Sequence, residues 1–293
     1  MSSTEQGVPS IVAVVGGGTM GAGIVQQFLT CGAEVVLVEA TGEAAEAGRA
    51  RVAAGLDKAR QRGRIDAEPD TYLARLRTVT TPSDIPVDAG LVVEAVPEKP
   101  ELKIAVLTAA EAAVGEETVL ASNTSSLSIT ELAAVLKHPR RFLGMHFFNP
   151  VPASKLVEVV VAPQTADGVV ESVRGWVKAL GKTEVVVKDA PGFATSRLGV
   201  MLGLEAIRMV EEGVASPADI DTAMELGYRH PMGPLRLTDL VGLDVRLAIA
   251  EYLASELGDR FAPPELLRRM VAEGRLGRKS GQGFHTWDEG EKR

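Results

Sequence analysis

The sequence predicts a parallel α/β domain followed by an all-α C-terminal domain. Over the first two-thirds of the chain, apolar strand-like runs alternate with alanine-rich helical patterns, which is typical of a parallel sheet covered by helices. After residue 188 the strand-like runs stop and only helical patterns follow. We therefore expect a boundary near Asp189, with domains at residues 1–188 and 189–293.

The expected strands are short apolar segments at 11–15, 34–39, 90–96, 118–122, 140–147, 154–162 and 182–188. In the C-terminal domain, Gly and Pro turns separate the helical patterns. Helices are expected there at Met201–Glu212, Pro217–Leu226, Leu235–Leu257 and Pro264–Glu273.

Length and composition describe a globular protein. The chain has 293 residues, of which 45% are hydrophobic and 24% charged, so it can bury a sizeable core. The net charge of −8 argues against a nucleic-acid partner. No uncharged apolar run approaches the roughly 20 residues that cross a bilayer, so we expect no membrane insertion. The single cysteine, Cys31, and a start without a signal-peptide pattern favour a cytoplasmic protein.

A glycine pattern directly follows the first expected strand. In VVGGGTMGAG, Gly16, Gly18 and Gly21 form a G-x-G-x-x-G motif where a helix is expected to begin. Glycines suit these positions because the turn is tight, the backbone approaches a pyrophosphate and the helix packs closely on the strand. An ordinary tight turn is the alternative, but the strands on either side favour a Rossmann-type dinucleotide-binding domain.

Glu39 ends the second expected strand, eighteen residues beyond Gly21. A carboxylate at this position binds the ribose hydroxyls of a dinucleotide. Its charge opposes a 2′-phosphate and no Arg follows within the next few residues, so the sequence favours NAD over NADP. The alternative is a solvated carboxylate at a strand end.

Residues 48–64 are strongly basic within an acidic protein. The segment carries one acidic residue, Asp57, and the basic residues Arg49, Arg51, Lys58, Arg60, Arg62 and Arg64. Two interpretations stay open. The segment is either a solvated helix face or an anion site for the phosphates of a second nucleotide-bearing ligand such as coenzyme A.

His146 and Glu158 interrupt two apolar runs in GMHFFNPVPASKLVEVV. The two runs flank a short connection, so we expect antiparallel neighbours in which these two residues lie opposite each other on one face. A carboxylate beside an imidazole fixes its tautomer and stabilises its protonated form, as a general base requires. From the residues alone, a structurally satisfied buried pair is an equal alternative.

The segment ASNTSS at 121–126 follows an expected strand. Its hydroxyl and amide groups would lie at the carboxyl end of the sheet, where open α/β folds bind ligands. Ser and Asn also cap helices, and a helix is expected to follow, so a capping role is the alternative.

Taken together, these motifs resemble the short-chain-length 3-hydroxyacyl-CoA dehydrogenases. The resemblance runs from about residue 10 to residue 287 and includes GGGTMGAGI, VVEAVPE, ASNTSS, GMHFFNPVP with KLVEVV, KDAPGF, HPMGPLRLTDLVGLD and GRKSGQGF. It implies an NAD-binding domain followed by a helical domain that forms a homodimer and helps to close the active site.

The resemblance also implies roles for individual residues. His146 matches the catalytic base, Glu158 its orienting partner and Ser125 a hydroxyl that contacts the substrate. The cofactor contacts are matched by Glu98, Lys103, Asn149 and Lys279. The family binds coenzyme A near the basic helix, where Arg62 is the candidate contact.

One position departs from the family pattern. The chain reads PGFATSRL, so Ser196 stands where these enzymes usually carry an active-site Asn. Serine is shorter than asparagine and loses the fixed geometry of the amide. This departure puts full activity, or the usual substrate, in question.

The expected activity is NAD-dependent oxidation of the 3-hydroxyl of a 3-hydroxyacyl-CoA, or the reverse reduction. One alternative is a related dehydrogenase of a hydroxy acid without coenzyme A, such as a sugar acid or carnitine. Another is a non-catalytic NAD-binding structural protein. The presence of both His146 and Glu158 counts against the non-catalytic alternative.

Overall fold

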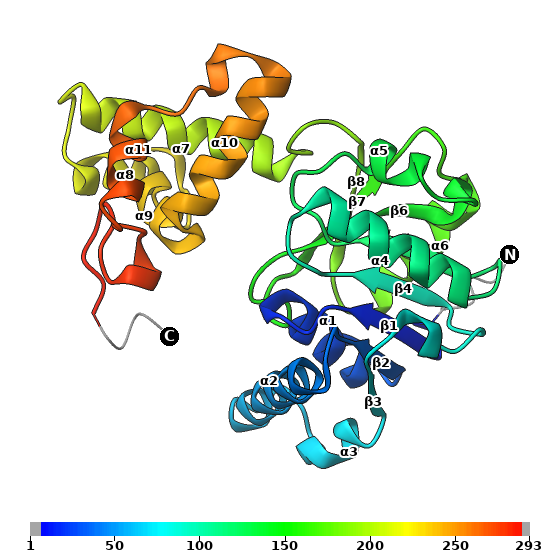
Figure 1. Cartoon of the computed structure of the whole chain (residues 1–293). Helices are drawn as coiled ribbons and strands as arrows, with labels where there is room; N and C mark the ends of the chain where they lie inside the picture. Colours follow the sequence, from blue (N-terminus) through cyan, green and yellow to red (C-terminus); the bar gives the residue numbers. More distant parts are fainter. Residues whose placement is uncertain (1–6, 289–293) are drawn as a thin grey trace, which may run out of the picture. The chain divides into compact units, whose positions relative to one another are not determined.

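The structure is a computed structural model that describes residues 7–288. The chain separates into two compact units, with the division between Asp189 and Ala190. The first unit contains an eight-stranded sheet with helices packed against it, and the second is built of helices (Figure 1). The α/β class with a helical C-terminal part is therefore confirmed.

The strands of the sheet lie in the order β3-β2-β1-β4-β5-β6-β7-β8. β7 is antiparallel to β6, and the other neighbouring pairs are parallel. The strands are β1 (Ile11–Val15), β2 (Glu34–Val38), β3 (Leu76–Val79), β4 (Leu91–Glu94), β5 (Val119–Ser122), β6 (Phe142–Phe147), β7 (Leu156–Val161) and β8 (Thr183–Lys188).

The central strands are almost continuously apolar because helices and connections cover both faces of the sheet. Val12, Val14 and Leu91 are fully buried in the core that these layers form. The helices of this unit are α1 (Thr19–Thr30), α2 (Gly42–Gln61), α3 (Pro69–Leu73), α4 (Pro100–Ala113), α5 (Ile129–Ala134) and α6 (Asp167–Ala179), with 3-10 turns at Pro82–Asp84 and Pro139–Arg141.

Strand β3 is absent from the strands that the sequence predicts. It lies at the edge of the sheet, and within LRTV only Leu76 is buried. A four-residue edge strand with one buried position has neither a long apolar run nor a clear alternation, so hydrophobic periodicity does not reveal it.

The second unit contains five α-helices within the described residues: α7 (Thr195–Glu211), α8 (Pro217–Tyr228), α9 (Pro234–Val241), α10 (Leu243–Leu257) and α11 (Glu265–Ala272). 3-10 turns lie at Asp259–Phe261 and Arg278–Ser280. The core of this unit includes Leu204, Ile220, Leu235, Leu253 and Leu267, so all five helices bury apolar side chains against one another.

Two helix boundaries differ from the predictions. The single helix expected at Leu235–Leu257 is wrong, because Gly242 has φ +101° and separates α9 from α10. Such a conformation strains any residue with a Cβ, so the helix cannot continue through it. Helix α7 begins at Thr195 rather than at Met201, since tertiary packing outweighs the low helix propensity of its glycines. Within the described residues, every helix is too short or too polar to span a membrane.

Candidate functional site

The glycine-rich turn between β1 and α1 leaves no space for side chains. Gly16 has φ +101° and donates its N–H to the Val38 carbonyl at 2.8 Å. A Cβ at Gly21 would overlap the Gly16 carbonyl oxygen. Gly18 precedes the first turn of α1 without a capping side chain, so the N-terminus of this helix remains accessible to an anion.

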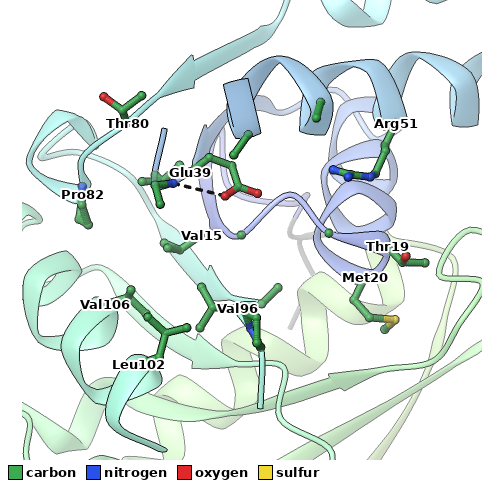
Figure 2. Close-up of a pocket in the computed structure, with 18 residues that line it drawn as sticks. Val15, Thr19, Met20, Glu39, Arg51, Thr80, Pro82, Val96, Leu102 and Val106 are labelled. Carbon is green, nitrogen blue, oxygen red and sulfur yellow. Dashed lines mark hydrogen bonds between the residues drawn. The ribbon is translucent and has the colours of Figure 1, made fainter. Parts of the chain in front are cut away.

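A hollow of about 620 Å³ lies beside this turn (Figure 2). It opens where strands β1, β2 and β4 end and where the strand order reverses, as ligand sites of open α/β sheets do. Its lining is mostly apolar, with Val15, Val38, Ala44, Ala47, Pro82, Val96, Leu102 and Val106 among its residues. This lining suits a flat aromatic base and its ribose.

Glu39 and Arg51 are the charged side chains around the hollow (Figure 2). Glu39 accepts the N–H of Gly17 at 2.5 Å and that of Ala40 at 3.3 Å, which fixes its carboxylate at the end of β2. Arg51 donates to the Gly17 carbonyl at 3.0 Å. In the sequence, Arg51 stands out only as part of the basic segment, because 34 residues separate it from Gly17 and no motif links the two.

A buried ionic network lies where β4 ends. The Lys103 ammonium contacts Glu94 at 2.7 Å, Glu98 at 3.1 Å and the Val96 carbonyl at 3.1 Å. Burial raises the pKa of Glu94, although Lys103 partly opposes this. Burial alone would also raise the pKa of Glu98, but the Lys103 charge and hydrogen bonds outweigh it and hold that pKa below its usual value.

Glu98 holds the loop that follows β5. It accepts hydrogen bonds from the Thr124 hydroxyl at 2.5 Å and from the Ser125 N–H at 3.0 Å. The capping alternative for ASNTSS is wrong, because Ser128, two residues beyond it, caps α5 through the N–H of Glu131. The serine and threonine side chains of ASNTSS instead donate to two carboxylates, Ser122 to Glu94 and the other three to Glu98.

Lys103, which pairs with Glu98, is only 1% exposed. The residues that line the hollow do not include it, so the structure does not bring its ammonium to the dinucleotide hollow directly. Its burial is not predictable from the sequence, because a lysine on an amphipathic helix normally reaches solvent.

His146 and Glu158 meet across β6 and β7 in the register that the sequence predicts. His146 Nδ1 lies 2.8 Å from a Glu158 carboxylate oxygen, and the two residues are 7% and 0% exposed. The ring of Phe148 lies 4.3 Å from the imidazole, measured between ring centroids. The contact with the carboxylate stabilises the tautomer that carries hydrogen on Nδ1.

Asn123 is a further residue of this region that sequence analysis did not single out. Its side-chain oxygen accepts the Phe147 N–H at 2.9 Å, which joins the loop after β5 to the residue next to His146. Asn149 is exposed and lies just beyond β6. The motif ASNTSS draws attention to the Asn123 amide. Its partner, the Phe147 N–H, could not be predicted, because the contact depends on β6 lying beside β5.

The basic segment, which begins on α2 and continues past its end, divides into two groups. Arg49 and Arg51 donate to backbone carbonyls, and Arg60 pairs with Glu68. The remaining three basic side chains belong to exposed residues: Lys58, Arg62 and Arg64. Exposure of these three side chains fits either interpretation of the segment, so the anion contact at Arg62 stays a prediction.

Two predicted site residues belong to the second unit. Ser196 lies in the first turn of α7. Lys279 lies in the 3-10 turn Arg278–Ser280 and forms an ion pair with Asp244 at the start of α10.

Two family models together match most of the chain. The model for the NAD binding domain of 3-hydroxyacyl-CoA dehydrogenase matches residues 11–190, and the model for the C-terminal domain of the same enzyme matches residues 192–287. A probable 3-hydroxybutyryl-CoA dehydrogenase of Deinococcus radiodurans is 43% identical over 275 residues, which cover 94% of this chain and 99% of that protein.

Solved structures give the same result. The (S)-3-hydroxybutyryl-CoA dehydrogenase of Ralstonia eutropha superposes with a TM-score of 0.90 at 42% identity and covers 96% of this chain and 100% of that one. FadB2 of Mycobacterium tuberculosis superposes with a TM-score of 0.92 at 41% identity, with the same coverage.

Proposed function

Because the chain belongs to the 3-hydroxyacyl-CoA dehydrogenase family, we propose that His146 and Glu158 carry out the proton transfer of its reaction. The chain is an NAD-dependent oxidoreductase that converts a 3-hydroxyacyl-CoA to the 3-ketoacyl-CoA, or catalyses the reverse reduction. The observation that supports the proposal is the 2.8 Å contact between the imidazole and a fully buried carboxylate.

The described residues fit NAD. The turn at Gly16 and Gly21 excludes side chains where a pyrophosphate approaches the backbone, and no side chain caps the N-terminus of α1, where an anion binds favourably. Glu39, which also lines the hollow, would bind the ribose hydroxyls. When bound, NAD supplies the hydride acceptor of the oxidation.

In the oxidation, His146 removes the proton of the 3-hydroxyl through Nε2, since Nδ1 is held by Glu158. The carboxylate stabilises the imidazolium that results. Burial of the pair strengthens this electrostatic interaction, because little water screens it.

The other site residues position the reactants. We assign Ser125 to the substrate oxygen, with its loop held by Glu98. Lys103 acts indirectly by orienting Glu98. Further cofactor contacts are proposed for Asn149, Glu98 and Lys279, a substrate contact for Ser196, and a coenzyme A phosphate contact for Arg62.

We propose that the protein works as a homodimer joined through residues 189–293 and that it is cytoplasmic. Exposed apolar side chains of the second unit support the first proposal. The single cysteine supports the second.

The test is an NADH-linked assay with acetoacetyl-CoA, longer 3-ketoacyl-CoAs and free 3-keto acids. We expect turnover of the thioesters and little with the free acids. His146→Ala should lower kcat by about 10²–10⁴-fold with nearly unchanged NAD affinity, and Glu158→Gln should lose less because a polar partner remains. A His146→Ala enzyme with the wild-type rate would leave the pair a structural one.

A further inference from the structure

Arg51 brings a positive charge to the dinucleotide hollow (Figure 2). The residue belongs to α2 and is exposed, and its Nη1 atom donates to the Gly17 carbonyl at 3.0 Å. The arginine–carboxylate ion pairs within residues 7–288 involve other arginines. A guanidinium has five N–H donors, so the bond to Gly17 leaves donors for a ligand.

Glu39 and Arg51 are anchored to the same residue of the glycine turn. The Gly17 N–H donates to Glu39 at 2.5 Å, and the Gly17 carbonyl accepts from Arg51. The two side chains are therefore held by separate backbone bonds and not by an ion pair with each other. A ligand in the hollow meets a carboxylate that accepts hydroxyl groups and a guanidinium that binds an anion.

The N-terminus of α1 lines the same hollow through Gly18, Thr19 and Met20. No side chain caps this N-terminus, and its first turn contains no acidic residue. Helix N-termini bind phosphate groups through their backbone N–H groups and the partial positive charge of the helix. Arg51 contacts Gly17, the residue directly before Gly18, so a second positive group lies beside the expected phosphate position.

A dinucleotide carries phosphate at up to two places: the pyrophosphate, which NAD and NADP share, and the 2′-phosphate of NADP. A carboxylate that binds the ribose hydroxyls opposes a 2′-phosphate there. In the proposed function Glu39 binds these hydroxyls, so a guanidinium placed for a 2′-phosphate would work against its neighbour. The pyrophosphate is the anion that remains, and its place in a Rossmann-type fold is the N-terminus of the first helix.

We propose that Arg51 binds the pyrophosphate of NAD and raises the affinity of the protein for its cofactor. The proposal rests on the proposed function, in which Glu39 binds the ribose. Guanidinium–phosphate hydrogen bonds are charge-assisted and often bidentate, so a single side chain contributes substantially. The bond to Gly17 orders the side chain before the cofactor arrives, which lowers the entropic cost of binding.

Ligand binding tests the proposal without turnover. A titration that follows NADH fluorescence gives the Kd of NADH, and displacement of NADH gives the Kd of ADP and of adenosine. Arg51→Gln should weaken NADH and ADP by about tenfold and adenosine, which lacks phosphate, by less than about twofold. Arg51→Lys should lie in between, because it keeps the charge without the planar fork. Arg60→Gln is the control, since Arg60 lies on the same helix, pairs with Glu68 and does not line the hollow.

Ionic strength gives a second measurement. Salt screens the attraction between an exposed guanidinium and a phosphate. The Kd of NADH should therefore rise with added NaCl more steeply for the wild type than for Arg51→Gln. Parallel salt dependences of the two proteins would contradict a charge contact.

The outcomes separate this inference from the proposed function. If the wild type binds NADH but reduces no 3-ketoacyl-CoA, the proposed function fails and the binding test of Arg51 still stands. Wild-type affinity of Arg51→Gln for NADH and ADP overturns the inference. An equal loss for adenosine also overturns it, because Arg51 would then only stabilise the glycine turn. A larger loss of kcat/KM with NADPH than with NADH overturns it in favour of a 2′-phosphate contact, and a raised KM for acetoacetyl-CoA alone in favour of a coenzyme A contact.

Discussion

The Glu39 carboxylate is held at the edge of the dinucleotide hollow by the backbone N–H groups of Gly17 and Ala40. A fixed negative charge there opposes a 2′-phosphate. We expect kcat/KM to be at least about tenfold higher with NADH than with NADPH. Glu39→Gln should lower the ratio of kcat/KM for NADH to that for NADPH, because it removes the repulsion while Arg51 remains nearby. Glu43→Gln, at an exposed position in the first turn of α2, should leave this ratio unchanged. Similar kcat/KM values for both cofactors in the wild type would contradict the assignment.

Ser196 carries a second prediction at the scale of a residue. A hydroxyl does not extend as far as an amide, so we expect its contact with the substrate to run through a water, which orients less well than a direct bond. Loss of one well-placed donor costs about 2.7–4 kcal/mol in the transition state, of which a water recovers part. Ser196→Asn should therefore raise kcat, and Ser255→Asn on α10 should not. Lower activity of Ser196→Asn on every thioester would instead indicate a site built around serine.

At the scale of elements, one buried lysine links β4, α4 and the loop after β5. In Lys103→Met, the fully buried Glu94 carboxylate keeps its hydrogen bonds from Ser122 and Val96 but loses its counter-ion. Removal of one partner of a buried ion pair typically lowers the free energy of unfolding by about 3–5 kcal/mol. Urea denaturation measures this loss. Lys58→Met on the exposed face of α2 should change stability by less than about 0.5 kcal/mol. A Lys103→Met protein of wild-type stability would show that Glu94 is protonated in the fold.

The break between α9 and α10 depends on Gly242 at φ +101°. Gly242→Ala places a Cβ in a sparsely populated positive-φ conformation that costs about 1–3 kcal/mol, and 3.0 Å from an Asp244 oxygen. We expect unfolding free energy to fall by about that amount. Gly227→Ala in α8 meets no atom within 4 Å and should be neutral or slightly stabilising. Equal effects of the two substitutions in thermal unfolding would contradict this explanation.

At the scale of the whole molecule, the second unit exposes more large apolar side chains than a small helical domain needs to. Leu226 and Tyr228 are 79% and 76% exposed. We expect a dimer at micromolar concentration in sedimentation velocity, and Leu226→Lys with Tyr228→Lys should shift it toward monomer. Val87→Lys, at a 67% exposed position of the first unit, is the control and should remain dimeric. A wild-type monomer would exclude this arrangement.

Local patterns were enough for those features that adjacent residues determine. The apolar runs predict the central strands, because a strand buried on both faces must be apolar. The glycine motif predicts the tight turn, because a turn packed against a helix must lack side chains. The short connection between β6 and β7 also sets their register, so the contact of His146 with Glu158 followed from the chain alone. Edge strand β3 did not, because it buries only one residue.

By itself, the sequence determined the α/β class, the dinucleotide turn, the pairing of His146 with Glu158 and the family. Only the tertiary structure decided where charges far apart in the chain meet. It buried Lys103 between two carboxylates, brought Arg51 to the glycine turn and buried Arg246 against the glycines of α7. The reason is that periodicity along a chain reports which face of an element is buried, whereas the partner of a buried charge depends on the order and packing of elements that the chain connects only at long range.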